Sequence, residues 1–425
     1  MNTRRPTRRS RGQRRSGPAA HSAGFTLVEL MVALTGGLFI SLAVFALARD
    51  SGRFYQREAR LANATVSGLI GFERLRADLG RAGFLASPNA VRDPRLCGSP
   101  TMNWPTSLRN LASIQLSAPT ATYAALTANG RTPPVVTLAG SYTLSDVFGG
   151  KIVHPDGANT ATFFLSTQEG AGALRRLGNT AMPDAATMAT AFPQGRALRI
   201  VQNGKQYYAP IISTTGAPQP TVTFDANPNQ VQWRSSVCGL SDIVGSGAST
   251  ATINIVNFIQ YAVRAPQTPT AITAYKNLFD NSAQAPGEAG RTELTRVELD
   301  LAGNVLDGSE EIVAEYAVDL NLQVIADTSL GGDPKLSLLS PGDPQFTTFT
   351  GPVFQSANTP HRIRAVRVRL GVRSRDADRK TGIPSTAKQG LFRFDIGSGT
   401  AETFARVRTF QADVALHNQA DITWP

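Results

Sequence analysis

The sequence predicts an α+β fold in which one long N-terminal helix, apolar in its first half and amphipathic in its second, packs on antiparallel β-sheet and carries a large β-rich head. Three observations predict it. A mainly apolar run extends from Phe25 to Ala48, an amphipathic repeat continues it to about Leu79, and short alternating segments separated by turn residues begin near residue 85. The chain therefore places one helix first and its strands afterwards.

Residues 1–24 form a basic leader, with seven arginines and no acid. Positive charge beside an apolar segment stays on the cytoplasmic side of a membrane, so the leader predicts a cytoplasmic N-terminus and export of the remainder of the chain. The leader supplies seven of the formal charges behind the net +11, which leaves +4 on the remaining side chains. The basic composition is therefore a topology signal rather than a nucleic-acid signal.

The run of residues 25–48 is long enough to cross a membrane. At about 1.5 Å per residue it makes a helix of about 36 Å, against a hydrocarbon core of about 30 Å. It contains one charge, Glu29. A charge inside such a segment costs about 2.5–3.5 kcal/mol on insertion scales, so these residues are rare and usually functional.

Three kinds of export signal compete for this segment without explaining it fully. A secretory signal would be cut after Ala46-Leu47-Ala48, but its apolar part is usually about 7–15 residues long, and Glu29 near its start does not fit. A plain signal anchor also leaves Glu29 unexplained. A twin-arginine signal fits less well, because Arg8-Arg9 and Arg14-Arg15 are followed by polar residues.

The heptapeptide Gly24-Phe25-Thr26-Leu27-Val28-Glu29-Leu30 resembles the processing site of the type IV pilin superfamily, which includes the pseudopilins of type II secretion. The resemblance implies that prepilin peptidase cuts between Gly24 and Phe25, that the Phe25 amine is N-methylated, and that the apolar helix stays as an anchor. A glycine at the scissile bond lets the backbone lie close to a protease.

The resemblance also implies a role in assembly for Glu29, which would favour docking of an incoming subunit. The freed Phe25 amine is positive, and pairing it with Glu29 in the same chain or a neighbour offsets the cost of burying either charge. The alternative is that Glu29 reaches out to the lipid headgroups.

Many pilins carry a proline midway along this helix, and here Gly36-Gly37 stands instead. Each glycine weakens a helix by about 1 kcal/mol relative to alanine, so the pair could supply the same softness. The alternative is close packing against a neighbouring helix, which small residues allow in membranes.

Residues 49–84 are expected to continue the helix as its amphipathic half. The predicted packing stripe, at spacings of three, four or seven, is Phe54, Leu61, Thr65, Leu69, Phe72, Leu75 and Leu79. Gly80 and Gly83 are stop signals. The alternative is two helices broken near Ser51-Gly52.

Residues 85–264 and 291–425 are expected to form two β-rich lobes, joined by a linker over residues 265–290 that is rich in Pro, Ala and Thr. In the first lobe, residues 198–208 predict a hairpin turning at Asn203-Gly204, and residues 252–263 a β segment. In the second lobe, residues 294–301 predict a strand before a turn near Gly303-Asn304.

Two strands are predicted near the end of the chain. The first is carried by alternation of Val366, Val368, Leu370 and Val372 with polar residues. The second is carried by Phe410, Ala412, Val414 and Leu416.

Four further segments resemble PilW-type minor pilins in the same order along the chain: residues 76–84, 310–324, 363–373 and 408–418. The match is imperfect at His417-Asn418, where the family more often has Arg-Asn, and weak over residues 100–290. The resemblance implies a minor type IV pilin that helps to initiate pilus assembly and so supports twitching motility, adhesion or DNA uptake. A mature chain of 401 residues, 24 fewer than 425, is bulky for a repeating subunit and favours low copy number or a tip position.

The implied partners are other minor and major pilins, prepilin peptidase, the inner-membrane assembly platform and a tip adhesin. The implied location is the inner membrane, crossed once with the head in the periplasm, and then the pilus at the cell surface. Two alternatives stay open. One is a minor pseudopilin of a type II secretion system, and the other is a released periplasmic binding protein that begins at Arg49.

Cys97 and Cys238 are the two cysteines of the chain. Outside the inner membrane they would meet an oxidising compartment, so a disulfide is expected, with two free thiols as the alternative. Chain-entropy models give such a long loop closure about 5 kcal/mol. The four histidines, His21, His154, His361 and His417, have no metal-ligand spacing.

No catalytic or phosphate-binding motif is found, so the chain is not expected to be an enzyme or to hold a cofactor. The acid pairs Asp376 with Asp378 and Asp307 with Glu310 could ligate calcium, but solvated loop acids are commoner. An arginine stripe could contact DNA phosphate, although a solvated strand face is commoner and DNA is not expected as a partner. The stripe is Arg364, Arg367, Arg369, Arg373 and Arg375.

Overall fold

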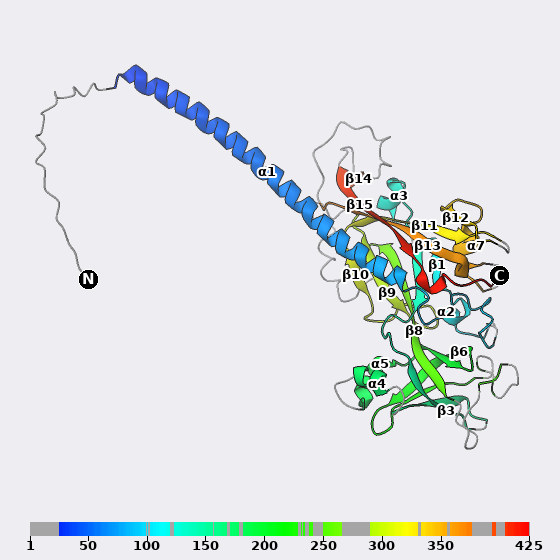
Figure 1. Cartoon of the computed structure of the whole chain (residues 1–425). Helices are drawn as coiled ribbons and strands as arrows, with labels where there is room; N and C mark the ends of the chain where they lie inside the picture. Colours follow the sequence, from blue (N-terminus) through cyan, green and yellow to red (C-terminus); the bar gives the residue numbers. More distant parts are fainter. Residues whose placement is uncertain are drawn as a thin grey trace, which may run out of the picture. The chain divides into compact units, whose positions relative to one another are not determined.

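The computed structural model (Figure 1) describes most of the chain after the leader. The described residues are 25–98, 100, 103–119, 123–155, 157–167, 171–177, 182–227, 231, 233, 238–240, 250–265, 290–329, 333–354, 358–375, 393–396 and 404–424. Gly24 with the rest of the leader, His21 included, lies outside them. So do nearly all of the predicted linker and the pair Asp376 and Asp378, and these predictions stay predictions.

The fold is α+β, with one long helix followed by antiparallel strands. The helices are α1 (Leu27–Gly80), α2 (Thr106–Arg109), α3 (Ala124–Ala128), α4 (Ala171–Leu177), α5 (Ala185–Ala191) and α7 (Phe346–Thr350), with 3-10 turns η1 (Pro360–Arg362) and η3 (His417–Gln419). Helix α1 runs through Ser51-Gly52 without a break. Contacts divide the chain into two compact units, residues 1–59 and residues 60–425.

In the first unit, the described part of α1 leaves its large apolar side chains exposed, from Leu27 at 75% to Phe54 at 65%. In the second unit, α1 buries Leu61, Phe72 and Leu75. The predicted stripe is thus correct for most of its members but wrong for Phe54 and for Leu69, which is 47% exposed. Leu69 points away because the face that meets the sheet is centred on two glycines, which a count of apolar residues does not detect.

One sheet of the second unit covers this part of α1. Its strands are β12 (Leu336–Leu339), β11 (Ala317–Asp327), β13 (Ile363–Arg373), β15 (Phe404–Ala415) and β14 (Arg393–Asp395), in that spatial order and all antiparallel. The predicted alternation on β13 is confirmed, because Val366, Val368, Leu370 and Val372 are all fully buried. They share one core with Phe72, Leu75 and Leu79 of the helix.

A second sheet contains ten strands, which are β1 (Ile114–Ser117), β2 (Val135–Gly140), β3 (Phe148–Val153), β4 (Thr160–Leu165), β5 (Ala197–Gln202), β6 (Lys205–Thr215), β7 (Thr221–Asp225), β8 (Ala251–Arg264), β9 (Glu293–Leu299) and β10 (Glu311–Ala314). Its pairings close on themselves. β8 pairs with β3, then β4, β7, β6 and β5 follow in turn, and β5 pairs with β8 again. These six strands form a closed antiparallel barrel, which leaves no open edge among them.

Strand β8 belongs to two parts of this sheet. Its residues 251–256 pair with β3 and β5 inside the barrel, whereas residues 257–264 pair with β2 and β9 outside it. The barrel is therefore an insertion that leaves the sheet after β2 and returns through β8. It has its own core, which includes Phe163, Ile200, Phe224 and Met188. In Figure 1 its strands β3 and β6 lie around the end of β8 remote from β11 and β13.

The predicted hairpin is confirmed. β5 and β6 pair antiparallel around Asn203 and Gly204, which both have positive φ, as a two-residue turn of this kind requires. The predicted β segment over residues 252–263 is β8, and the one over 294–301 is β9. β9 pairs with β8 along seven residues, so strands from the two predicted lobes share one sheet.

Candidate functional site

The first turn of α1 is capped by the residue before it. Thr26 Oγ1 accepts a hydrogen bond from the Glu29 N–H at 3.2 Å, and Thr26 O accepts one from the Leu30 N–H at 3.1 Å. Thr26 is thus the N-cap and Glu29 the third helical residue, the positions of Thr and Glu in a capping box. Sequence reasoning missed this role, although the Thr-x-x-Glu spacing was visible.

Glu29 therefore has a local reason to stand where it does. A carboxylate in the first turn is favoured by the helix dipole by about 0.3–1 kcal/mol. The side chain is exposed, so its oxygens remain accessible to a cation from outside the helix. The cap satisfies the backbone N–H of Glu29, but it does not neutralise the side-chain carboxylate.

The apolar surface of this half of the helix is continuous. Phe39, Phe45 and Leu47 are each about 70% exposed or more, and α1 is long and apolar enough to cross a membrane. An apolar surface of this size is unstable in water and marks a membrane or protein contact.

Gly36 and Gly37 lie in the middle of that surface. A Cβ atom added at either position meets nothing within 4 Å. No contact within the described chain therefore requires a glycine here, and the two explanations from the sequence, local softness or a neighbouring helix, both remain.

Within the second unit, α1 packs closely on the head. A Cβ at Gly68 would stand 2.6 Å from Val372 Cγ2 on β13, and a Cβ at Gly71 would stand 2.7 Å from the Ala314 Cβ on β10 and clash with the Val313 carbonyl. Phe72 stacks on Phe410 of β15 with ring centroids 5.9 Å apart. Two glycines thus allow the helix to approach both sheets.

The last turn of α1 is held by a buried carboxylate. Asp78, only 3% exposed, accepts hydrogen bonds at 2.8 Å from both Tyr261 Oη of β8 and Arg296 Nε of β9. Tyr142 Oη donates to the Asp78 carbonyl at 3.1 Å. Burial, together with the charge of Asp78, raises the pKa of both tyrosines, so they stay protonated and donate.

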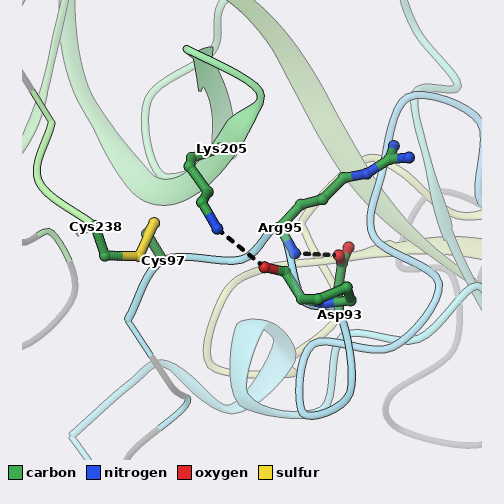
Figure 2. The surroundings of a disulfide bond; sticks show 6 residues. Asp93, Arg95, Cys97, Lys205 and Cys238 are labelled. Atoms are coloured by element: carbon green, nitrogen blue, oxygen red, sulfur yellow. Dashed lines mark hydrogen bonds between the residues drawn. A yellow bond between two sulfur atoms is a disulfide. The ribbon is translucent and has the colours of Figure 1, made fainter. Parts of the chain in front are cut away.

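The disulfide expected from the sequence is formed (Figure 2). Cys97 and Cys238 are bonded across 141 residues with a Cα–Cα distance of 5.4 Å, so neither thiol is free. Cys97 is fully buried and belongs to the barrel core. Its N–H donates to the Gln206 carbonyl at 2.9 Å, and the Gln206 N–H donates to the Arg95 carbonyl at 2.9 Å. These two backbone hydrogen bonds hold the segment before Cys97 against the β5–β6 hairpin.

The arginine stripe is mostly engaged within the head. Arg367 pairs with Asp413 at 2.7 Å and Arg369 with Asp319 at 2.8 Å. The expectation of a solvated face is wrong for Arg373, which is fully buried with its guanidinium 5.0 Å from the ring centroid of Tyr316. The alternation of buried and exposed residues on β13 ends before Arg373, and its guanidinium contacts aromatic rings instead of water.

Within the described residues, no group of three or more His, Cys, Asp or Glu side chains could hold a metal ion. Two of the histidines stack on tryptophans: His154 on Trp233, with centroids 3.9 Å apart, and His361 on Trp424 at 4.4 Å. Burial lowers the pKa of His361 to about 4, so this ring is neutral near pH 7.

Comparison of the chain with protein-family models, with curated proteins and with solved structures found no match.

Proposed function

We propose that the chain is a minor type IV pilin. Prepilin peptidase removes residues 1–24, the Phe25 amine is N-methylated, and the apolar half of α1 anchors the protein in the inner membrane until it joins other pilins. The observation that carries the proposal is the heptapeptide of residues 24–30 directly in front of an exposed, membrane-length apolar helix.

The chemistry of the helix start supports this proposal. Cleavage after Gly24 leaves Phe25 directly before the cap residue Thr26, so the new amine lies within one turn of Glu29. The Glu29 carboxylate is exposed and not consumed by the cap. A cation from the same or a neighbouring chain can therefore pair with it, and a pair costs less to bury than either charge alone.

The head is better suited to a subunit present once in the pilus than to one repeated along the fibre. It contains two sheets and an inserted barrel with a separate core, which is a bulky load for a repeating subunit. We infer a tip or initiating role, with other minor and major pilins, the inner-membrane assembly platform and a tip adhesin as partners. The protein has no enzymatic role and no cofactor in this proposal.

The test is the N-terminal sequence and mass of the membrane protein from cells with and without prepilin peptidase. We expect a peptidase-dependent start at N-methylated Phe25. A start at Arg49 would indicate a secretory signal cut after Ala48, and an uncut leader in the presence of peptidase would indicate a plain anchor. Either result contradicts the proposal.

Two variants separate processing from assembly. Gly24→Val blocks the approach of the scissile bond to the protease, so the uncut form should accumulate. Glu29→Gln should be cut normally but should fail to enter pili, because the amide cannot neutralise an amine. If Glu29→Gln assembles as well as wild type, the charge of Glu29 has no role beyond the cap.

The same motif occurs in pseudopilins, so a type II secretion role is the second candidate. Deletion of the gene distinguishes them. Loss of surface pili with secretion intact supports the pilin, and loss of secreted enzymes with pili intact supports the pseudopilin.

A further inference from the structure

A cavity of about 360 Å³ lies on the outer surface of the barrel, where the β5–β6 hairpin meets the segment before Cys97. It is lined by Arg95, Arg199, Val201, Gly204 and Gln206. This volume is at the lower end of the range for small-molecule sites, about 300–1,000 Å³. Figure 2 shows the Arg95 guanidinium extending away from Asp93, the disulfide and Lys205.

Arg199 in this cavity is ordered but not neutralised. Its Nε donates to Gln206 Oε1 at 2.8 Å and its Nη1 to Asn254 Oδ1 at 3.2 Å. Both acceptors are neutral amides, which fix the plane of the guanidinium and leave its full charge. Two other arginines of the head that are held at similar distances face carboxylates instead, in the pairs Arg196–Glu298 at 2.7 Å and Arg369–Asp319 at 2.8 Å.

The carboxylate that Gln206 links to Arg199 is already satisfied by other donors. Asp93 is buried, and it accepts from Ser87 Oγ at 2.7 Å, from the Arg95 N–H at 2.9 Å and from Gln206 Nε2. In the described part of the chain, neither Arg95 nor Arg199 forms an ion pair.

The rest of the lining is open. Lys205 is not part of it, and its Nζ donates to the Pro94 carbonyl at 3.3 Å. The space above Gly204 is open, since a Cβ there would meet nothing within 4 Å. Val201 supplies the one apolar side chain of the lining.

We propose that this cavity binds an oxyanion, the carboxylate or phosphate of a ligand no larger than an acidic monosaccharide. Guanidinium groups form charge-assisted, often bidentate hydrogen bonds with both kinds of oxyanion. Arg199 is the pre-ordered contact, and exposed Arg95 is the second. The proposal concerns the barrel alone and does not depend on how α1 is processed or assembled.

The experiment uses the full chain in an uncharged detergent and ligand-observed NMR with three probes: inorganic phosphate, glucuronate and glucose. We expect phosphate, glucuronate or both to bind with a Kd of about 10 mM or tighter, and glucose not to bind. Affinity should fall as salt rises from about 50 to about 200 mM, because the site is open to solvent and its charges are screened. Binding of phosphate alone or of glucuronate alone identifies which oxyanion the site takes.

Arg95→Ala tests the site without threatening the fold, because this side chain is exposed. It should weaken binding about fivefold or more, and Arg199→Gln should do the same. The matched control is Arg92→Ala, an exposed arginine three residues earlier that does not line the cavity, and it should change the affinity by less than about twofold. An equal loss in Arg92→Ala, binding of glucose as tight as glucuronate, or no binding of either anion would overturn the proposal.

Discussion

Gly71→Ala should destabilise the head, although the same substitution at Gly52 on the same helix should not. At an unconstrained helix position, Gly→Ala is favourable by about 1 kcal/mol. At Gly71 the new methyl would lie 2.7 Å from the Ala314 Cβ and against the Val313 carbonyl. The Val313 carbonyl is part of the backbone of β10, so it cannot rotate aside as a side chain can.

The expected size follows from these two opposing terms. Overpacking costs about 1–3 kcal/mol, and the rigid backbone at Gly71 places this site at the upper end. Subtracting the helix gain of about 1 kcal/mol leaves a net loss of about 2 kcal/mol. Gly68→Ala meets the side chains of Val372 and Phe410 first, which can shift, so its net loss should be smaller.

The assay is urea unfolding of the full chain in detergent, followed by tryptophan fluorescence. It reports on residues 60–425, because all three tryptophans lie there: Trp104, Trp233 and Trp424. With a slope of about 3 kcal/mol per M of urea, a loss of 2 kcal/mol lowers the midpoint by about 0.7 M. Gly52→Ala, with nothing within 4 Å and outside residues 60–425, should not lower the midpoint. An unchanged or raised midpoint for Gly71→Ala would refute the claim that α1 is seated through this glycine.

Three further substitutions have defined outcomes. Replacing Cys97 and Cys238 by serine opens a loop closed across 141 residues and should cost about 5 kcal/mol by chain entropy. The measurement is the thermal stability of the variant, which should be lower than that of the wild type and should not change when reductant is added. Asp78→Asn removes one charge of a buried pair and leaves Arg296 only its more distant, half-exposed partner Glu311 at 3.8 Å, so it should cost about 3 kcal/mol in urea unfolding. Glu293→Gln should change the pH dependence, because desolvation raises the pKa of Glu293 to about 7. The folded state then binds more protons than the unfolded state between about pH 4.5 and pH 7, so this group lowers stability as pH rises through that window, and the amide should flatten the slope.

Each of these has a matched control in the chain. Glu73→Gln breaks an exposed pair with Arg76 and should cost under about 1 kcal/mol, so an equal loss for Asp78→Asn would remove the special role of burial. Glu315→Gln removes an exposed charge that adds to the raised pKa of Glu293, so it should flatten the pH slope only in part. If reductant changes the stability of the double serine variant, which has no disulfide, the effect of reductant on the wild type cannot be assigned to the disulfide.

The elements that could be predicted from the sequence are those with a local cause. The apolar run, the Asn203-Gly204 turn and the alternation ending at Val372 depend on neighbours within a few residues, and the structure contains all three elements. The seat of α1 could not be predicted in full, because the close approach at Gly68 and Gly71 depends on strands more than 200 residues away. The capping role of Thr26 was visible in the sequence and was missed.

The barrel was not predicted, because no local pattern distinguishes its strands from those of an open sheet. Closure depends on β5 returning to β8, a pairing between segments about 55 residues apart, as between Arg199 and Asn254. The oxyanion cavity depends on that closure in turn. Arg95 is near Arg199 only because backbone pairing with Gln206 holds residues 95–97 against the hairpin.

Strand β8 connects the two places to which we assign roles. Asn254 near its start fixes Arg199 in the cavity, and Tyr261 near its end fixes Asp78 of α1. Seven residues of strand separate them by about 23 Å. Coupling between the two would need an element with two arrangements, whereas β8 is paired on both sides at Tyr261 and directly before Asn254. Such a strand has one arrangement, so a ligand in the cavity should leave the seat of the helix unchanged, and the barrel should serve recognition independently of assembly.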